Sequence, residues 1–521
     1  MAMVVRGGQV LNQTGTALDR ADILIQAGRI TAVAPHLGAT PDAQVLDASG
    51  QIVLPGLVNA HTHAHNALLK GLADRWTLED LLTYSAALNA NRTVEEQYLS
   101  ASLNAVEMAK TGCTAAYDLF MAVPAPTAEG VEAVVRAYTD VGLRATLAPA
   151  VADLVFFRTV PGLLDLLPAD LATAIAAMRA APTEALLRLT EEAVRRWHGA
   201  AQGRIRMHVA PTIPGQCTDA FLAGCARLAR EQGVGIHTHL AETKVQVIHA
   251  RDRWGQTIVE RLGDLGLLTS GFVGAHGIWL LDDDIRRLAD VGAAVVHNPA
   301  SNLRTGAGLA PVREMLEHGV TVALGSDGSM ASDNQNLFEM MRFAALAGTV
   351  RFPYDQPRWL DGPTVWAMAT AGGARALGLA DEIGAIAVGR RADLVLVRAD
   401  SSALRPLNHA VNALVYAQTG ADVVTVIVDG RVVVADGRVT TVDESALRTR
   451  AEEVAADFRA RNGDAWALGA RLMPHVGVAC RVAAAKPYPV DRYAGPPPAP
   501  TTRGGLSGSF LLGAGPQSPG P

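Results

Sequence analysis

The chain has 521 residues, of which 49% are hydrophobic and 18% charged, a balance typical of a well-buried globular protein and not of a disordered one. Its 45 basic and 51 acidic residues give a formal net charge of −6. Because no Lys/Arg-rich block stands out either, the charge pattern excludes a nucleic-acid partner. The length exceeds that of one ordinary core, so we expect a large domain with additions.

Short strands separated by turns are predicted at both ends of the chain. The stretches "MVVRGGQVLN", "ADILIQAGRITAVAP" and "QVLDASGQIVLPG" have Gly and Asn/Asp where hairpin turns need them. The same pattern returns in "GRRADLVLVRAD" and "DVVTVIVDGRVVVADGRVTTVD". We therefore expect residues 1–52 and 384–445 to form one small β-sandwich domain.

Between residues 53 and 383, apolar runs alternate with helical segments such as "VEEQYLSASLNAVEMAKTG" and "TDAFLAGCARLAREQG". The second segment ends in Gly233, which can serve as a helix C-cap. Continuous apolar strands between helices indicate a parallel sheet in an α/β protein, and eight of them match a (β/α)₈ TIM barrel. The eight runs are 52–60, 114–119, 143–149, 205–210, 234–239, 272–276, 293–297 and 321–326.

The C-terminal part carries a charged segment, "ESALRTRAEEVAADFRARNG", which predicts a helical extension over residues 446–495. Residues 496–521 are rich in Pro, Gly and Ser, and we expect them to be disordered.

Cysteine usage and hydropathy favour the cytoplasm. The four cysteines are scattered and form no CxxC pair, so neither a disulfide framework nor a thiolate zinc site is expected; they are Cys113, Cys217, Cys225 and Cys480. The start "MAMVVRGGQV" lacks a signal-peptide core, and no apolar run is long enough to span a bilayer. We expect a cytoplasmic protein without a membrane partner, with a homo-oligomer as an alternative to a monomer.

The stretch "PGLVNAHTHAHN" places His61, His63 and His65 at every second position behind an apolar run. Alternate residues of a strand point to the same side, so His61 and His63 project together from the end of the first barrel strand. Two parallel imidazoles make a good half-site for a borderline metal such as zinc. An isolated HxH pair can equally be structural.

Further polar residues end later strands. "VGIHTHLAET" carries His237, His239 and Glu242, "FVGAHG" ends in His276, and "VTVALGSDGS" contains Asp327. Each alone could be a hydrogen-bonded buried residue. The carboxyl ends of parallel barrel strands open on one face, where catalytic residues collect. Together these residues predict a metal site at the barrel mouth.

In these motifs and their order the chain resembles the amidohydrolase superfamily, specifically its aminohydrolases acting on nitrogen heterocycles. That subgroup includes deaminases of adenosine derivatives, guanine deaminase and triazine hydrolases. The resemblance covers residues 1–445, including "GARALGLADEIGAIAVGRRADLVLV". It implies that the metal ligands are His61, His63, His239 and Asp327.

The resemblance also implies the catalytic residues. Asp327 would take a proton from the metal-bound water, Glu242 would shuttle that proton, and His276 would orient the water or polarise the substrate. Binuclear relatives bridge two metals with a carbamylated lysine, but the fourth strand, "GRIRMHVAPT", has none. We therefore expect one divalent ion, zinc first and iron as the alternative. His65 and His237 match no ligand position and should line the pocket or support the ligands.

The implied activity is a metal-dependent hydrolysis that deaminates an aminated purine, pyrimidine, pterin or triazine, releasing ammonia after attack by metal-bound hydroxide. An alternative is hydrolysis of another C–N or C–halogen bond on such a ring, or of a cyclic amide, because the water-activating residues are shared. A third reading, an inactive structural barrel, is disfavoured because the whole set of candidate metal and catalytic residues is intact.

Three residues are candidates for binding the small-molecule substrate. Trp76 lies in segment 67–84, which resembles the family's lid; it could stack on a flat ring or simply pack the loop. Glu107 falls where adenosine-type deaminases carry a ribose-binding Glu, or it is a solvated helix residue. His297 in "VVHNPASN" is expected to face the pocket.

Two further positions qualify the substrate. Asn302, in the same stretch as His297, could contact the pocket or fix the loop backbone. In "PTIPGQC", Thr212 stands where nucleoside deaminases of the family carry a substrate-contacting His. This departure puts a specific adenosine-derivative activity in doubt.

Overall fold

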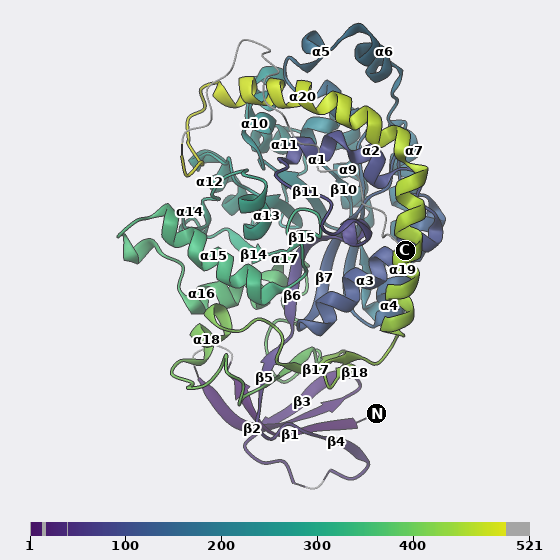
Figure 1. Cartoon of the computed structure of the whole chain (residues 1–521). Coiled ribbons are helices and arrows are strands. Elements are labelled where there is room, and N and C mark those ends of the chain that lie inside the picture. The colour runs from purple at the N-terminus through teal and green to yellow at the C-terminus, as the bar shows by residue number, and fades with distance from the viewer. Residues whose placement is uncertain (1, 13–16, 39, 496–521) are drawn as a thin grey trace, which may run out of the picture.

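The computed structural model describes residues 2–12, 17–38 and 40–495, so the tail predicted to be disordered, 496–521, lies outside the described residues. The described strands form a nine-stranded sheet, a six-stranded sheet and a four-stranded sheet. Figure 1 shows the sheet made from the chain ends at the bottom, and the other strands above it with helices around them. No helix in the described ranges is long and apolar enough to cross a bilayer.

The nine-stranded sheet combines the two ends of the chain, because β16 pairs antiparallel with β5 and β5 pairs parallel with β1. A core cluster of its own fills one face and includes Ile23, Leu394 and Ile427. Its strands are β1 (Ala2–Leu11), β2 (Leu18–Gln26), β3 (Arg29–Ala34), β4 (Ala43–Asp47), β5 (Gln51–Pro55), β16 (Leu394–Arg398), β17 (Val423–Val428), β18 (Arg431–Ala435) and β19 (Arg438–Val439).

The six- and four-stranded sheets are parallel. Their strands are β6 (Leu57–His63), β7 (Cys113–Phe120), β8 (Arg144–Val151), β9 (Ile205–Met207), β10 (Ala210–Pro211), β11 (Ile236–Leu240), β12 (Phe272–His276), β13 (Ala294–His297), β14 (Thr321–Leu324) and β15 (Asp327–Gly328). Each of the eight predicted apolar runs overlaps one of these strands; the fourth run reaches both β9 and β10, and β15 lies just beyond the eighth.

Main-chain hydrogen bonds connect these two sheets to each other. His237 N donates to Val209 O and His239 N donates to Thr212 O, both at 2.9 Å. The two sheets are also linked by the chain itself: β14 is the last strand of the four-stranded sheet, and the next strand, β15, pairs with β6 of the six-stranded sheet.

The predicted first run, 52–60, covers two strands of different sheets. At Gly56 the chain leaves the nine-stranded sheet, which is mixed, and enters the six-stranded parallel sheet. A Cβ atom at Gly56 would overlap the side chain of Thr114, so only glycine fits at this crossing. The run reads as continuous because β5 and the first part of β6 are both buried. The division into domains at 52/53, 383/384 and 445/446 stays a prediction.

Helices connect and cover the parallel strands. The two predicted from their periodicity are α3 and α9, and Gly233 ends α9 in the left-handed conformation with φ of 65°. The α-helices are α1 (Leu78–Thr83), α2 (Ser85–Asn89), α3 (Val94–Lys110), α4 (Ala128–Val141), α5 (Leu163–Leu166), α6 (Ala169–Ala177), α7 (Thr183–Trp197), α8 (Ala200–Gly203), α9 (Asp219–Gln232), α10 (Lys244–Trp254), α11 (Ile258–Asp264), α12 (Asp282–Asp290), α13 (Pro299–Arg304), α14 (Val312–Glu317), α15 (Leu337–Arg351), α16 (Gly362–Ala367), α17 (Gly373–Ala376), α18 (Ala410–Tyr416), α19 (Glu444–Arg461) and α20 (Gly463–Ala485). Short turns are η1 (Ala64–Leu69), η2 (Phe156–Arg158), η3 (Pro214–Gln216), η4 (Gln356–Arg358) and η5 (Met368–Gly372).

The C-terminal extension is helical, as predicted. In Figure 1, α19 runs along the side of the molecule beside α3, and α20 crosses the top. Val454 of α19 packs with Leu99 of α3. Gly469 of α20 lies where a Cβ would overlap the ring of Tyr84, so the close approach of α20 to segment 67–84 requires a residue without a side chain.

A buried ion pair joins β8 to the mixed sheet. Arg144 donates to both carboxylate oxygens of Asp393 at 3.2 Å and lies 3.5 Å from Asp429. We expect Arg144→Met to lower the free energy of unfolding by about 3–5 kcal/mol, because it leaves buried carboxylates without a partner. Urea-induced unfolding followed by circular dichroism measures this loss.

The matched control is Arg286→Met, since Arg286 pairs with Asp282 and Asp283 while its side chain is 56% exposed. Exposed pairs contribute about 0–1 kcal/mol. Equal losses in the two variants would contradict a structural role for the Arg144 pair.

Candidate active site

A β-bulge in β6 aims the first two histidines. The register of β6 with β7 shifts between Asn59 and Thr62. Two consecutive residues, Ala60 and His61, therefore both face the inner core, the buried cluster that also includes Val58 and Val296. Val58 and Ala60 belong to the inner core, and a regular strand would therefore turn His61 and His63 towards the helices. Bulges commonly redirect side chains beside active sites.

Main-chain carbonyl groups fix the rings of His63 and His239. Nδ1 of His63 is 2.6 Å from Leu119 O, and Nδ1 of His239 is 2.6 Å from Thr212 O. In a neutral ring, an Nδ1 that donates leaves a lone pair on Nε2, and burial lowers the pKa of His239 to about 3. The two Nε2 atoms face each other at 3.1 Å, where lone pairs repel unless a cation lies between them.

Asp327 brings a carboxylate to the same point. Its Oδ1 is 3.3 Å from Nε2 of His63 and 3.6 Å from Nε2 of His61. Nε2 of His61 has no hydrogen-bond partner among the described residues. Burial acts to raise the pKa of Asp327, but His63 and His276 hold it below its usual value, which keeps the carboxylate ionised.

These residues fit a divalent ion. Two overlapping groups have their ligand atoms within 4.8 Å of one another. Tetrahedral ligands about 2.05 Å from zinc are about 3.3 Å apart, close to the 3.1 Å between the facing nitrogens of His63 and His239. Neutral imidazoles with one carboxylate suit zinc and similar metals. The groups are His61, His63 and His239, and His61, His276 and Asp327.

His276 is oriented by two asparagines. Its Nδ1 lies 2.9 Å from Asn302 Oδ1, which can accept only from an N–H group. Its Nε2 then faces Oε1 of Glu242 at 3.6 Å and Oδ2 of Asp327 at 3.9 Å. Asn298, with Nδ2 3.4 Å from both ring nitrogens, encloses His276 from another side.

Glu242 is a buried carboxyl group whose surroundings favour the protonated form. Burial raises its pKa well above the usual value, and the neighbouring charges of Asp327 and Glu79 add to this. Glu79 comes from α1 and accepts a hydrogen bond from Thr243 Oγ1 at 2.6 Å. Gln246 contacts the Glu242 carboxyl at 3.4 Å. A carboxyl group with a raised pKa therefore lies beside one, Asp327, with a lowered pKa.

The backbone is strained at two of these positions. His276 and Asp327 have φ of 72° and 60°, a left-handed conformation that costs a non-glycine residue about 1–3 kcal/mol. Such strain persists where the surroundings impose it, and at both strand ends it turns a polar side chain towards the same cluster.

Sequence reasoning missed Asn298 and Glu79. Asn298 directly follows β13, at the same C-terminal strand ends where the candidate ligands lie, so its place was a usable signal. Glu79 had no such signal, because it reaches Thr243 only through the fold of segment 67–84.

His65 and His237 lie beside the cluster without belonging to either ligand group. The ring of His65 is 5.3 Å from that of His63, and its Nδ1 accepts from Met121 N at 3.1 Å. Nε2 of His237 is 3.2 Å from Nδ1 of His61. Both contacts agree with supporting positions.

Trp76 and Glu107 have partners of their own. Trp76 stacks on Tyr84 at 4.8 Å and lies 6.4 Å from Trp466 of α20, which is the loop-packing alternative. Glu107 forms an ion pair with Lys70 at 2.6 Å. Neither contact is with a candidate metal ligand, and substrate binding by these two residues stays a prediction.

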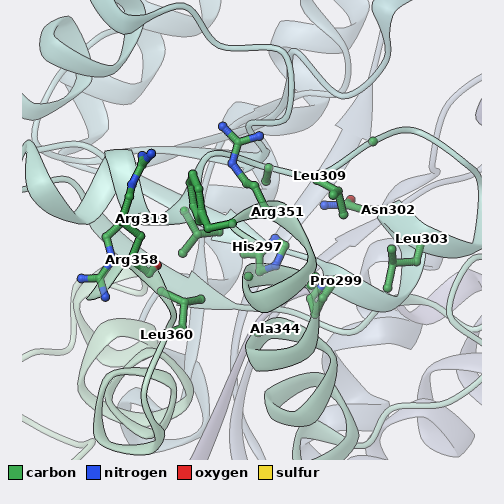
Figure 2. Close-up of a pocket in the computed structure, with 16 residues that line it drawn as sticks. His297, Pro299, Asn302, Leu303, Leu309, Arg313, Ala344, Arg351, Arg358 and Leu360 are labelled. Atoms are coloured by element: carbon green, nitrogen blue, oxygen red, sulfur yellow. Dashed lines mark hydrogen bonds between the residues drawn. The ribbon is translucent and has the colours of Figure 1, made fainter. Parts of the chain in front are cut away.

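His297 is on the same side of β13 as Val295. Val295 packs in the outer core, the buried cluster between the strands and the helices, whereas Val296 packs in the inner core. It lines a cavity between α13, α14 and α15. Figure 2 shows its ring there with Leu360 and Arg351 nearby. Burial lowers the pKa of His297 to about 3. The structure thus places His297 behind the strand, and Asn298 beside His276.

A cluster of buried imidazoles and a carboxylate at the ends of parallel strands, with a buried glutamate of raised pKa beside it, is the arrangement of a metal-dependent hydrolase. The Amidohydrolase family model matches residues 52–433. The chain therefore belongs to the amidohydrolase family, which confirms the resemblance.

Two relatives align over most of the chain. A 5-methylthioadenosine/S-adenosylhomocysteine deaminase of Symbiobacterium thermophilum is 38% identical over 470 residues, covering 87% of this chain and 98% of the relative. A 5'-deoxyadenosine deaminase of Methanosarcina mazei is 35% identical over 462 residues, covering 88% and 99%. They confirm the predicted enzyme class, a hydrolase acting on carbon–nitrogen bonds.

Two solved structures are similar to this chain over most of its length. An adenosine deaminase of Xanthomonas campestris with bound zinc has a TM-score of 0.75 at 26% identity, covering 88% of this chain and 98% of its own. A mutant atrazine chlorohydrolase of Arthrobacter aurescens with zinc and atraton has a TM-score of 0.78 at 26% identity, covering 87% and 100%.

The geometry predicts which changes remove the metal. His239→Ala or Asp327→Asn should strip most of the zinc, because each deletes a ligand atom of the cluster. Metal content per chain is measured by elemental analysis after dialysis. His297→Ala is the control and should keep its zinc, because His297 faces the outer cavity; full zinc content in the first two variants would reject the ligand assignment.

Proposed function

We propose that the chain hydrolytically deaminates an aminated purine of the adenosine type and releases ammonia. The observation that carries the proposal is the position of Glu242, a buried carboxyl group with a raised pKa, beside the cluster in which Nε2 of His63 faces Nε2 of His239. The relatives supply the substrate class, since they are named as deaminases of methylthioadenosine, S-adenosylhomocysteine and 5'-deoxyadenosine.

We assign one zinc ion to His61, His63, His239 and Asp327, supported by their spacing and by the zinc in the two similar structures. A divalent ion there would lower the pKa of a bound water from 15.7 towards about 7 and so supply the nucleophile. The chain supplies the orientation, through the carbonyl groups that hold His63 and His239.

Proton transfer belongs to the two carboxyl groups. Glu242 carries a proton and donates it to the ring nitrogen next to the attacked carbon. Asp327 is ionised and accepts the proton that the attacking water releases. That proton then passes to the leaving amine, because ammonia leaves only after protonation. As the C–N bond breaks and the ring carbonyl forms, the remaining hydroxyl proton returns to Glu242. His276, held by Asn302, polarises the water or the substrate between them.

Thr212 presents a hydroxyl group where nucleoside deaminases of the family have the imidazole of a His. Its carbonyl orients His239, whereas its buried hydroxyl has no hydrogen-bond partner within the described part of the chain. This favours a second candidate function: removal of another leaving group, a halide or an alkylamine, from a similar ring. The similarity to atrazine chlorohydrolase also supports it.

The proposal also covers the fold. We propose that the parallel strands β6 to β15 close into one (β/α)₈ barrel, supported by the bonds between β10 and β11 and by the pairing of β15 with β6. We also propose that the nine-stranded sheet folds over its own core as a small β-sandwich. A cytoplasmic location and a homo-oligomeric state stay predictions.

Glu242→Gln should keep its zinc but lower kcat by about 10²–10⁴-fold, the range for loss of a general acid. The amide preserves the shape of the side chain and removes the proton that is transferred. Single-turnover ammonia release measures the effect. Glu132→Gln, an exposed glutamate paired with Arg196, is the matched control; near-normal turnover of Glu242→Gln would reject the role.

The substrate class is tested by ammonia release from adenosine, 5'-deoxyadenosine, methylthioadenosine, guanine, cytosine and melamine. We expect the highest kcat/KM among the adenosine derivatives. A parallel arm follows halide release from 6-chloropurine riboside and a chlorinated triazine. Halide release without ammonia release would favour the second function, and no release of either by the zinc-loaded enzyme would overturn both.

A further inference from the structure

The three imidazoles of the candidate zinc site are held by different means. His63 and His239 each donate Nδ1–H to a main-chain carbonyl at 2.6 Å. A carbonyl oxygen only accepts, so it permits one tautomer, in which Nε2 keeps its lone pair. Nδ1 of His61 instead faces another imidazole, Nε2 of His237, at 3.2 Å. An imidazole nitrogen can donate or accept, so this partner alone does not determine the tautomer of His61.

The surroundings of His237 remove that ambiguity. Both His61 and His237 are 0% exposed, and Nδ1 of His237 has no hydrogen-bond partner in the described chain. The ring of Tyr117 stands at 73° to that of His237, with centroids 4.2 Å apart. An edge N–H group against a ring face is favourable, whereas a bare lone pair there is not.

Tyr117 is itself anchored at its far end. Its hydroxyl group lies 2.6 Å from Nδ1 of His208, which precedes β10. The ring of Tyr117 therefore cannot turn away from His237 without losing a short buried hydrogen bond. His208, Tyr117 and His237 thus contact one another in sequence, and His237 contacts His61.

We propose that His237 is a positioning residue that holds His61 in the tautomer able to bind the metal. His237 keeps its hydrogen on Nδ1 and accepts at Nε2 the Nδ1–H of His61. Nε2 of His61 is then left with a lone pair, 3.6 Å from Oδ1 of Asp327. This role rests on the zinc site of the proposed function and gives that site its third fixed imidazole.

The test compares zinc affinity in the full chain. His237→Leu removes the acceptor and should weaken zinc binding by about 10–100-fold, the usual effect of losing a group that orients a metal-binding His. His237→Gln returns an acceptor and should recover most of the affinity. The dissociation constant is measured by competition with a chromophoric chelator, so the readout needs no substrate.

Exposed His198, exchanged for Leu, controls for the general effect of losing a histidine. If His237→Leu fails to fold, nitrogen-15 histidine spectra of the zinc-loaded wild type give the same answer, because they report which ring nitrogen carries hydrogen. We expect hydrogen on Nδ1 of both His61 and His237.

Zinc binding by His237→Leu within threefold of the wild type overturns the role, as does a Gln variant no better than Leu. Spectra with hydrogen on Nε2 of His237 overturn it too. A wild type that binds no zinc overturns the proposed site together with this role, whereas zinc binding without deamination rejects only the proposed function.

Discussion

The site depends on one constraint: Nε2 of His63 and Nε2 of His239 face each other at 3.1 Å, while Nδ1 of each ring faces a main-chain carbonyl oxygen. Their repulsion would open the cluster if the rings were free to turn. They are not free, because the carbonyl groups of Leu119 and Thr212, at the ends of neighbouring strands, hold their other nitrogens. The strands thus hold these nitrogen atoms in a fixed arrangement that a bound cation would stabilise.

Much of this could be predicted from the sequence. Strands buried on both faces appear as continuous apolar runs, and the polar residues that follow those runs, His239, His276 and Asp327, do meet at one face. The bulge at His61 could not be predicted, because it arises from the register between β6 and β7, which no local pattern encodes. The pair spacing of His61 and His63 was informative only because the bulge turns both inward.

His297, Trp76 and Glu107, whose substrate contacts stay predictions, have surroundings that the sequence does not reveal. Alternation along β13 predicts that His297 faces one side, but the sequence does not say which side is the interior, and the structure gives that place to Asn298. Trp76 and Glu107 lie in segments whose partners, Tyr84 and Lys70, are decided by how the helices pack. The structure also links Glu79 of α1 to Thr243, so the segment before α3 contributes charge next to Glu242.

The chain returns to the site after α20. Arg492 donates to Leu280 O and its own carbonyl accepts from Leu309 N, and the ring of Tyr493 lies against Trp279 at 4.8 Å. This places the chain next to the loop that follows His276. A chain shortened to end before Arg492 would lose these contacts and uncover Trp279, whose side chain is fully buried in the loop directly after His276.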